Sequence, residues 1–195
     1  MNQRIEELYN ELIKIITPDT VFACIGAVKT TSYIDSIGPQ VGDRLTKAGL
    51  PYVYGTTKKP YNGLTACGIG AKINRIHHNQ VIVAIDCCIS YTDEKLYKIG
   101  ITNGGIKPGA GMNKKLPIIG DYAIKAFMLR EYNTDLIMNS KLMTSGKCDF
   151  YVQETDKIVN IISTAIIQAY NYICKKTIEN IFSDKANIIN VNKLL

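Results

Sequence analysis

Apolar residues near the start of the chain follow the spacing of one face of a helix, at Ile5, Leu8, Leu12, Ile15 and Ile16. Thr17 and Pro18 end this pattern, so we expect an amphipathic N-terminal helix. The next apolar run, residues 21–25, is continuous and stops at Gly26. Such a run predicts a strand that is buried on both faces, with a sharp turn at its end.

Helical spacing and continuous apolar runs keep alternating as far as residue 85. Helices are predicted over 36–48 and 64–76. Strands are predicted over 50–54 and 81–85, and the second of these contains only Val, Ile and Ala. Strands that alternate with helices form a parallel sheet covered on both faces. The pattern therefore predicts an α/β fold, a three-layer α/β/α sandwich with a mostly parallel mixed sheet.

The rhythm changes in the second half of the chain. Strands are predicted over 96–102 and 122–129, and they flank a Gly/Pro-rich stretch at 104–117. This stretch is too long for an ordinary connection, which indicates a functional loop. A helical apolar stripe from Ile158 to Ile173 predicts a long helix that closes the domain. Because no repeat or linker interrupts the chain, we expect residues 1–195 to form a single domain.

Composition restricts the class of protein. Apolar residues make up 46% and charged residues 21% of the chain, as in a folded protein rather than a disordered one. The net charge is +6, but the lysines are scattered instead of forming one stripe, which argues against a nucleic-acid partner. The N-terminal segment is charged and no apolar run approaches about 18 residues, so we expect a cytoplasmic protein without membrane association.

The six cysteines form no recognisable disulfide or metal pattern. Cys24, Cys87 and Cys88 lie within apolar, strand-like runs, and no C-x-x-C pair is present. We expect the cysteines to be small buried residues in a reducing compartment. His77 and His78 fall at the end of a predicted helix and lack the i,i+4 spacing of helical zinc ligands, so we expect no metal and no cofactor.

Candidate chemistry lies at two aspartates that follow predicted strands. In an open parallel sheet, ligands bind beyond the carboxyl ends of the strands. Asp35 follows the loop after strand 21–25, and Asp86 ends strand 81–85. If these strands are neighbours, the two carboxylates can face each other, and one pKa then rises while the other stays low. Each aspartate also has a structural interpretation, Asp35 as the N-cap of helix 36–48 and Asp86 as a capping carboxylate.

Five separated segments resemble, in order, the signature segments of the YyaC-type sporulation proteins. They are Cys24-Ile25-Gly26, Asp35-Ser36-Ile37-Gly38-Pro39-Gln40-Val41-Gly42, Val53-Tyr54-Gly55-Thr56, Ile85-Asp86, and the block KPGAGMNKKLPIIGD that starts at Lys107. The resemblance spans about residues 21–129. This family is related to the germination protease of spores and, more distantly, to hydrogenase maturation endopeptidases.

The resemblance implies a sporulation-associated endopeptidase whose two catalytic aspartates match Asp35 and Asp86. It also implies that Gly26, Asn113 and Lys114 bind the substrate, a protein or peptide of the kind represented by small acid-soluble spore proteins. The implied fold is an α/β/α sandwich of the phosphorylase/hydrolase type. The implied location is the cytoplasm of a spore-forming bacterium, the forespore included.

Two other functions fit the same residues. A non-catalytic binding or scaffold protein of sporulation can use the same fold, with both aspartates as caps. A metal-dependent maturation peptidase needs a histidine beside the acidic positions, and this sequence has none at an equivalent place. The sequence leaves the oligomeric state open, a homo-oligomer included.

Overall fold

The computed structural model describes residues 2–28, 33–62, 65–109, 116–130 and 148–191, with side chains of the last helix from 150 to 182. Within these residues one sheet is formed by β1 (Val21–Cys24), β2 (Val53–Tyr54), β3 (Ile82–Ser90), β4 (Ile99–Asn103) and β5 (Tyr122–Arg130). Their spatial order is β2-β1-β3-β5-β4; β4 is antiparallel to β5, and the other pairs are parallel. This confirms the predicted α/β fold with a mixed, mostly parallel sheet.

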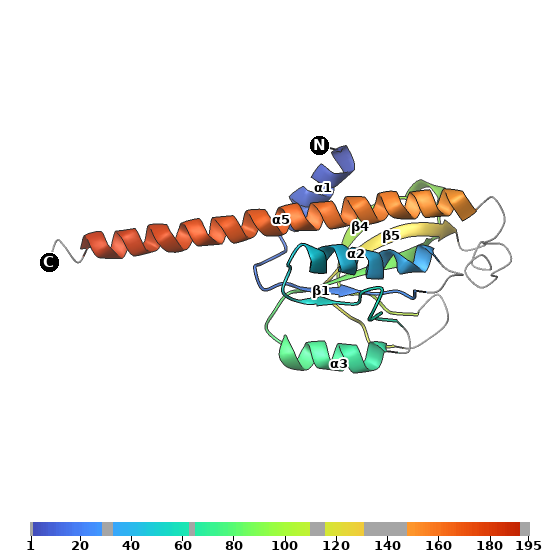
Figure 1. The fold of residues 1–195 in the computed structure, drawn as a ribbon, viewed down its shortest axis with the longest axis horizontal. Coiled ribbons are helices and arrows are strands. Elements are labelled where there is room, and N and C mark those ends of the chain that lie inside the picture. Colours follow the sequence, from blue (N-terminus) through green and yellow to red (C-terminus); the bar gives the residue numbers. More distant parts are fainter. Residues whose placement is uncertain (1, 29–32, 63–64, 110–115, 131–147, 192–195) are drawn as a thin grey trace.

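Helices cover both faces of the sheet (Figure 1). On one face lie α1 (Gln3–Leu12), α2 (Ile37–Lys47) and α5 (Cys148–Val191), and on the other lies α3 (Ala66–Ile76). Short 3-10 turns, η1 (Ile34–Ser36) and η2 (Asp93–Lys95), precede α2 and β4. The two helical layers bury separate apolar clusters, as strands that are apolar on both sides require.

Alternate residues of β3 belong to different clusters. Val83 and Ile85 pack with α1, α2 and α5, whereas Ile82 and Ala84 pack on the side of α3. Because this alternation continues along the strand, Asp86 projects on the α3 side of the sheet.

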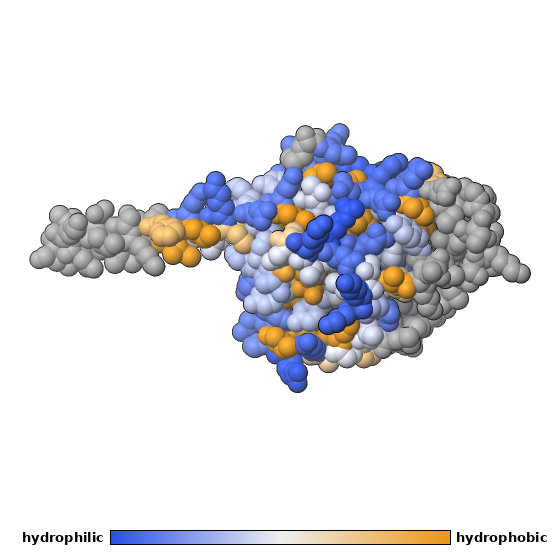
Figure 2. All heavy atoms as spheres, viewed as in Figure 1, coloured by the Kyte–Doolittle hydropathy of each residue, from blue (hydrophilic) through white to orange (hydrophobic). Residues whose placement is uncertain are grey.

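The predicted apolar stripe of α5 is the part that packs on the sheet. Its fully buried residues are Ile158, Ile162, Ala165, Ile166 and Ala169. The C-terminal half of the helix extends beyond the sheet (Figure 1), and the exposed side chains of Ile178, Ile181 and Phe182 form an apolar patch there (Figure 2). None of the described helices is both long enough and apolar enough to span a bilayer.

Three strands differ from their predicted boundaries by more than one residue. β3 continues to Ser90 instead of ending at Ile85, because the residues after Ile85 pair with β5. β4 begins at Ile99, after Tyr97 adopts a left-handed backbone with φ 59°. β2 contains two residues where the sequence predicts five. The first difference corrects the expected site, since Asp86 lies within a strand and not in a loop at its end.

Candidate active site

The C-terminal end of β1 lies beside the middle of β3, at the carboxyl edge of the sheet. Cys24, the last residue of β1, is paired with Ile85, and the amide of Ile25 donates to the Ile85 carbonyl oxygen at 2.7 Å. The two strands are therefore neighbours, as the pairing of the two aspartates requires. Asp86 is the first residue of β3 beyond the end of β1, and its side chain is half-buried.

Asp35 reaches the same edge from the turn η1. Its Oδ2 accepts a hydrogen bond from the backbone amide of Ala27 at 3.0 Å. Because Ala27 follows β1, this bond ties the turn before α2 to the end of the strand. The N-cap residues are Tyr33 for η1 and Ser36 for α2, so Asp35 does not occupy the N-cap position considered for it.

Glycines allow the backbone segments to come this close. A Cβ on Gly26 would lie 2.0 Å from the backbone oxygen of Asp35, and its φ is 151°. A Cβ on Gly38 would lie 2.0 Å from the oxygen of Ile25, and one on Gly42 would lie 1.9 Å from the backbone of the loop after β2. α2 therefore rests directly on the strand ends, and this contact positions Asp35. Gly26, a predicted substrate-binding residue, lies at the centre of it.

The two aspartates interact through their charges. Burial raises the pKa of the Asp86 carboxyl well above its usual range, and the negative charge of Asp35 raises it further. The amide of Cys87 donates to Oδ1 of Asp86 at 2.8 Å and partly opposes this shift, because it favours the carboxylate. Asp86 therefore keeps its proton to a higher pH than an exposed aspartate. The structure thus brings together the two residues that the sequence singles out.

Lys125 and Cys88 border Asp86 on the same side of the sheet. Lys125 of β5 is in register with Asp86, and Cys88 lies two residues further along β3. Burial and the charge of Asp86 raise the pKa of the Cys88 thiol to about 12, while the charge of Lys125 opposes the shift. Sequence reasoning misses Lys125, although a lysine inside the apolar run 122–129 is a signal that points to it.

Thiols beside the aspartates are held in their protonated form. Burial raises the pKa of the Cys24 and Cys87 thiols. The charge of Asp43 raises the pKa of Cys24 further, and the charges of Asp86 and Asp35 raise that of Cys87. A protonated thiol is a poor nucleophile, so the carboxyls are the better candidates for chemistry at this edge. Cys67 on α3 is exposed, which corrects the expectation that the cysteines are buried.

His77 has a structural role at the end of α3. It is buried, its Nε2 lies 2.7 Å from the hydroxyl of Tyr54, and its Nδ1 is hydrogen-bonded to the side chain of Gln80. The Gln80 amide in turn donates to the Asp19 carbonyl oxygen at 2.8 Å. Both ring nitrogens of His77 are therefore engaged. Over the described ranges, no three or more His, Cys, Asp and Glu side chains are grouped so that they could hold a metal ion.

Asn113 and Lys114, the other predicted substrate-binding residues, lie outside the described residues. Residues on either side of them are joined by an antiparallel bridge between Ile106 and Ile119. Asp121 accepts a hydrogen bond from the amide of Ile82 at 2.8 Å, which fixes the end of this segment at the start of β3.

Comparison with known proteins assigns the sequence to a family. Residues 1–148 match the family described as "Protein of unknown function (DUF1256)". The protein named "Uncharacterized protein YyaC" of Bacillus subtilis (strain 168) is 31% identical over 144 residues, which cover 68% of this chain and 69% of the relative. The family match contains the whole sheet and both aspartates, and it ends where α5 begins. The chain therefore belongs to the DUF1256 family.

Proposed function

We propose that this chain is an aspartate-dependent endopeptidase of sporulation, with Asp35 and Asp86 as its catalytic pair. The observation that carries the proposal is their electrostatic coupling: Asp86 is half-buried, and the charge of Asp35 raises the pKa of its carboxyl. A carboxyl of raised pKa beside a second carboxyl supplies an acid and a base from one residue type.

Asp86 is the proton donor and Asp35 is the base in this reaction. Asp35 takes a proton from water as the water oxygen attacks the peptide carbonyl carbon, while Asp86 protonates the carbonyl oxygen. These two transfers give a tetrahedral intermediate with two hydroxyl groups. Its C–N bond then breaks as Asp35 gives its proton to the leaving amine, and one of the two hydroxyl groups returns a proton to Asp86. Each acid or base step of this kind contributes about a hundred- to ten-thousandfold in rate.

The local geometry supports these roles. The Ala27 amide orients the Asp35 carboxyl through Oδ2. β3 has no β1 partner beyond Ile85, so the side of Asp86 that faces the end of β1 is not covered by that strand. The protonated thiols of Cys87 and Cys88 leave the carboxyls as the reactive groups.

The resemblance to the germination protease supports a protein substrate of the spore. Small acid-soluble spore proteins are therefore the substrates to test first, and the forespore cytoplasm is the proposed place of action. No metal or cofactor takes part in the proposed reaction.

The test compares wild type with Asp35→Asn and Asp86→Asn on an extract of small acid-soluble spore proteins. Asp43→Asn is the matched control, because Asp43 lies on α2 and binds Thr57, with its Oδ1 3.1 Å from the amide and its Oδ2 2.6 Å from the hydroxyl. We expect cleavage by wild type and by the control, and a loss of at least about a hundredfold in each catalytic variant. Undiminished cleavage by both catalytic variants would refute the assignment.

A non-catalytic binding protein is the second candidate, because the hydrogen bond from the Ala27 amide also gives the Asp35 carboxyl a structural role. That function predicts that Asp35→Asn, which preserves an acceptor oxygen, keeps sporulation normal in cells. The peptidase function predicts that the same substitution removes the cellular function even though the protein folds.

A further inference from the structure

β4 is the outermost strand on its side of the sheet, and among the described residues its outer edge pairs with no strand. The hydrogen bonds on its inner edge show which residues face β5. The amide of Gly104 donates to the Asp121 oxygen at 2.7 Å, and the Phe127 amide donates to the Lys98 oxygen at 3.0 Å. Since bonded and non-bonded pairs alternate in an antiparallel ladder, Gly100 also faces β5.

The intervening residues, Ile99, Ile101 and Asn103, therefore direct their backbone amides and carbonyls away from the sheet. An edge of this kind is a template for another strand, and proteins commonly cover it. The sequence of β4 contains no proline, so nothing in it blocks such pairing.

A groove of about 440 Å³ runs along this edge between β4 and α1. Its lining from the helix includes Arg4, Glu7 and Glu11, which are exposed and recur three and four residues apart on one face of α1. Its lining from the strand side is residues 97–101.

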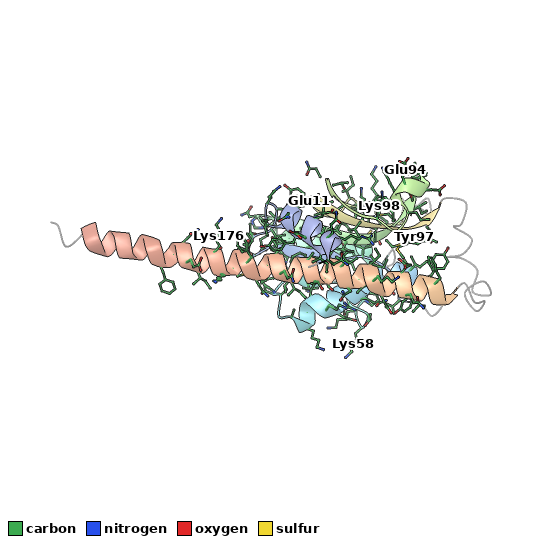
Figure 3. The ribbon with its side chains drawn as sticks, turned by 90° about the horizontal axis from the view of Figure 1, so that it is seen from above. Glu11, Lys58, Glu94, Tyr97, Lys98 and Lys176 are labelled. Carbon is green, nitrogen blue, oxygen red and sulfur yellow. The ribbon has the colours of Figure 1, made fainter. Side chains whose placement is uncertain are left out.

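The charges in the groove are ordered along its length. The Arg4 guanidinium donates to the Tyr97 carbonyl oxygen, so a positive charge lies at the end of the groove where Lys98 is also found. Glu7 and Glu11 follow along the helix, and Figure 3 shows Glu11 on the opposite side of Lys98 from Tyr97. The groove is thus basic at one end and acidic at the other.

We propose that this edge is the interface of a two-fold symmetric dimer, in which the β4 strands of two copies pair antiparallel. A two-fold axis at Ile99, the middle of the residues 97–101 that line the groove, places the outward-facing Ile99 of one copy opposite the same residue of the other. The same axis reverses the groove of the second copy, so Arg4 of one protomer faces Glu11 of its partner. A uniformly charged peptide would match only one end of the groove, which is why a second copy is the better occupant.

Sedimentation velocity over a range of protein concentrations tests the dimer. We expect a monomer–dimer equilibrium for wild type, and at least a tenfold weaker dimer for Glu11→Arg and for Arg4→Glu, each of which places like charges opposite each other. The double variant Arg4→Glu/Glu11→Arg should recover the wild-type equilibrium. Lys58→Glu, a change of the same sign and size as Arg4→Glu at an exposed loop after β2, should leave it unchanged.

Hydrogen exchange locates the contact independently of the charge variants. We expect the amides of Ile99 and Ile101 to exchange more slowly as the protein concentration rises across the dimer equilibrium. A protein that stays monomeric at all concentrations would overturn the proposal. A dimer whose dissociation constant is unchanged by both single charge reversals would also overturn it. Its interface would then lie elsewhere, for example on the protruding half of α5.

Discussion

The amide of Ile25 donates to the carbonyl oxygen of Ile85 at 2.7 Å, so the end of β1 is fixed beside the residue that precedes Asp86. The loop that leaves β1 then bonds Asp35 through the Ala27 amide. These two backbone contacts explain how carboxyls that are far apart in the chain come to share one edge of the sheet.

Replacing Asp86 with asparagine should stabilise the protein at neutral pH. In the folded state the Asp86 carboxyl has a raised pKa, so the folded chain binds more protons than the unfolded chain between the ordinary pKa and the raised one. The contribution of the protonated Asp86 carboxyl to the free energy of unfolding is therefore complete below the ordinary pKa of about 3.9. It is lost as the pH rises from that value through the raised pKa. The variant escapes this loss, which amounts to about 1.4 kcal/mol for each unit of the shift.

Chemical denaturation of wild type and Asp86→Asn across this pH range is the measurement. The two stabilities should converge at acid pH and separate as pH rises. A variant that is less stable than wild type at neutral pH would show that the Asp86 carboxylate is favourably paired in the fold.

Gly26→Ala should destabilise the protein and remove activity together. The new Cβ would lie 2.0 Å from the backbone oxygen of Asp35, at a φ of 151°. The backbone strain alone costs about 1–3 kcal/mol, and relief of the clash must move Asp35. Gly68→Ala is the control, since nothing lies within 4 Å of its Cβ and the helix α3 should gain about 0.5–1 kcal/mol. Thermal unfolding of both variants checks the prediction, and equal unfolding temperatures for Gly26→Ala and Gly68→Ala would contradict it.

The fold follows from the sequence because its signals are local. The continuous run at 81–85 predicts a strand buried on both faces, and that strand is the middle of the sheet. The extension of β3 to Ser90 could not be predicted in this way, because Asp86, Cys87 and Cys88 interrupt the apolar pattern. They remain in the strand through their pairing with β5, which is a tertiary effect.

The site was predictable only in part. The sequence places Asp35 and Asp86 after predicted strands, but the strand order that brings them to one edge of the sheet comes from the structure. The bond from Ala27 to Asp35 and the register of Lys125 with Asp86 depend on three-dimensional pairing, for which a single sequence has no local signal.

Tyr61→Phe should leave stability unchanged or raise it by about 1 kcal/mol. Tyr61 is fully buried, and its hydroxyl has no hydrogen-bond partner within the described part of the structure. Tyr170→Phe should instead lower stability by about 1 kcal/mol, because that hydroxyl donates to the Pro18 carbonyl oxygen at 3.0 Å. Urea unfolding of the two variants measures the difference, and a loss on removing the Tyr61 hydroxyl would reveal a partner for it.

Cys67 should react with a thiol reagent in the folded protein, whereas Cys24 should react only on unfolding. Cys67 is exposed on α3, and Cys24 has no exposed surface. Alkylation under native conditions followed by peptide mass spectrometry reads both sites in one sample. Rapid labelling of Cys24 would mean that the contact between α2 and β1 opens readily.

The pKa of the Asp86 side chain, measured by NMR titration of the carboxyl carbon, tests the account most directly. In wild type it should lie well above the ordinary aspartate value, and Asp35→Asn should lower it while burial keeps it raised. An ordinary pKa for Asp86, or one that Asp35→Asn leaves unchanged, would contradict the proposed pair.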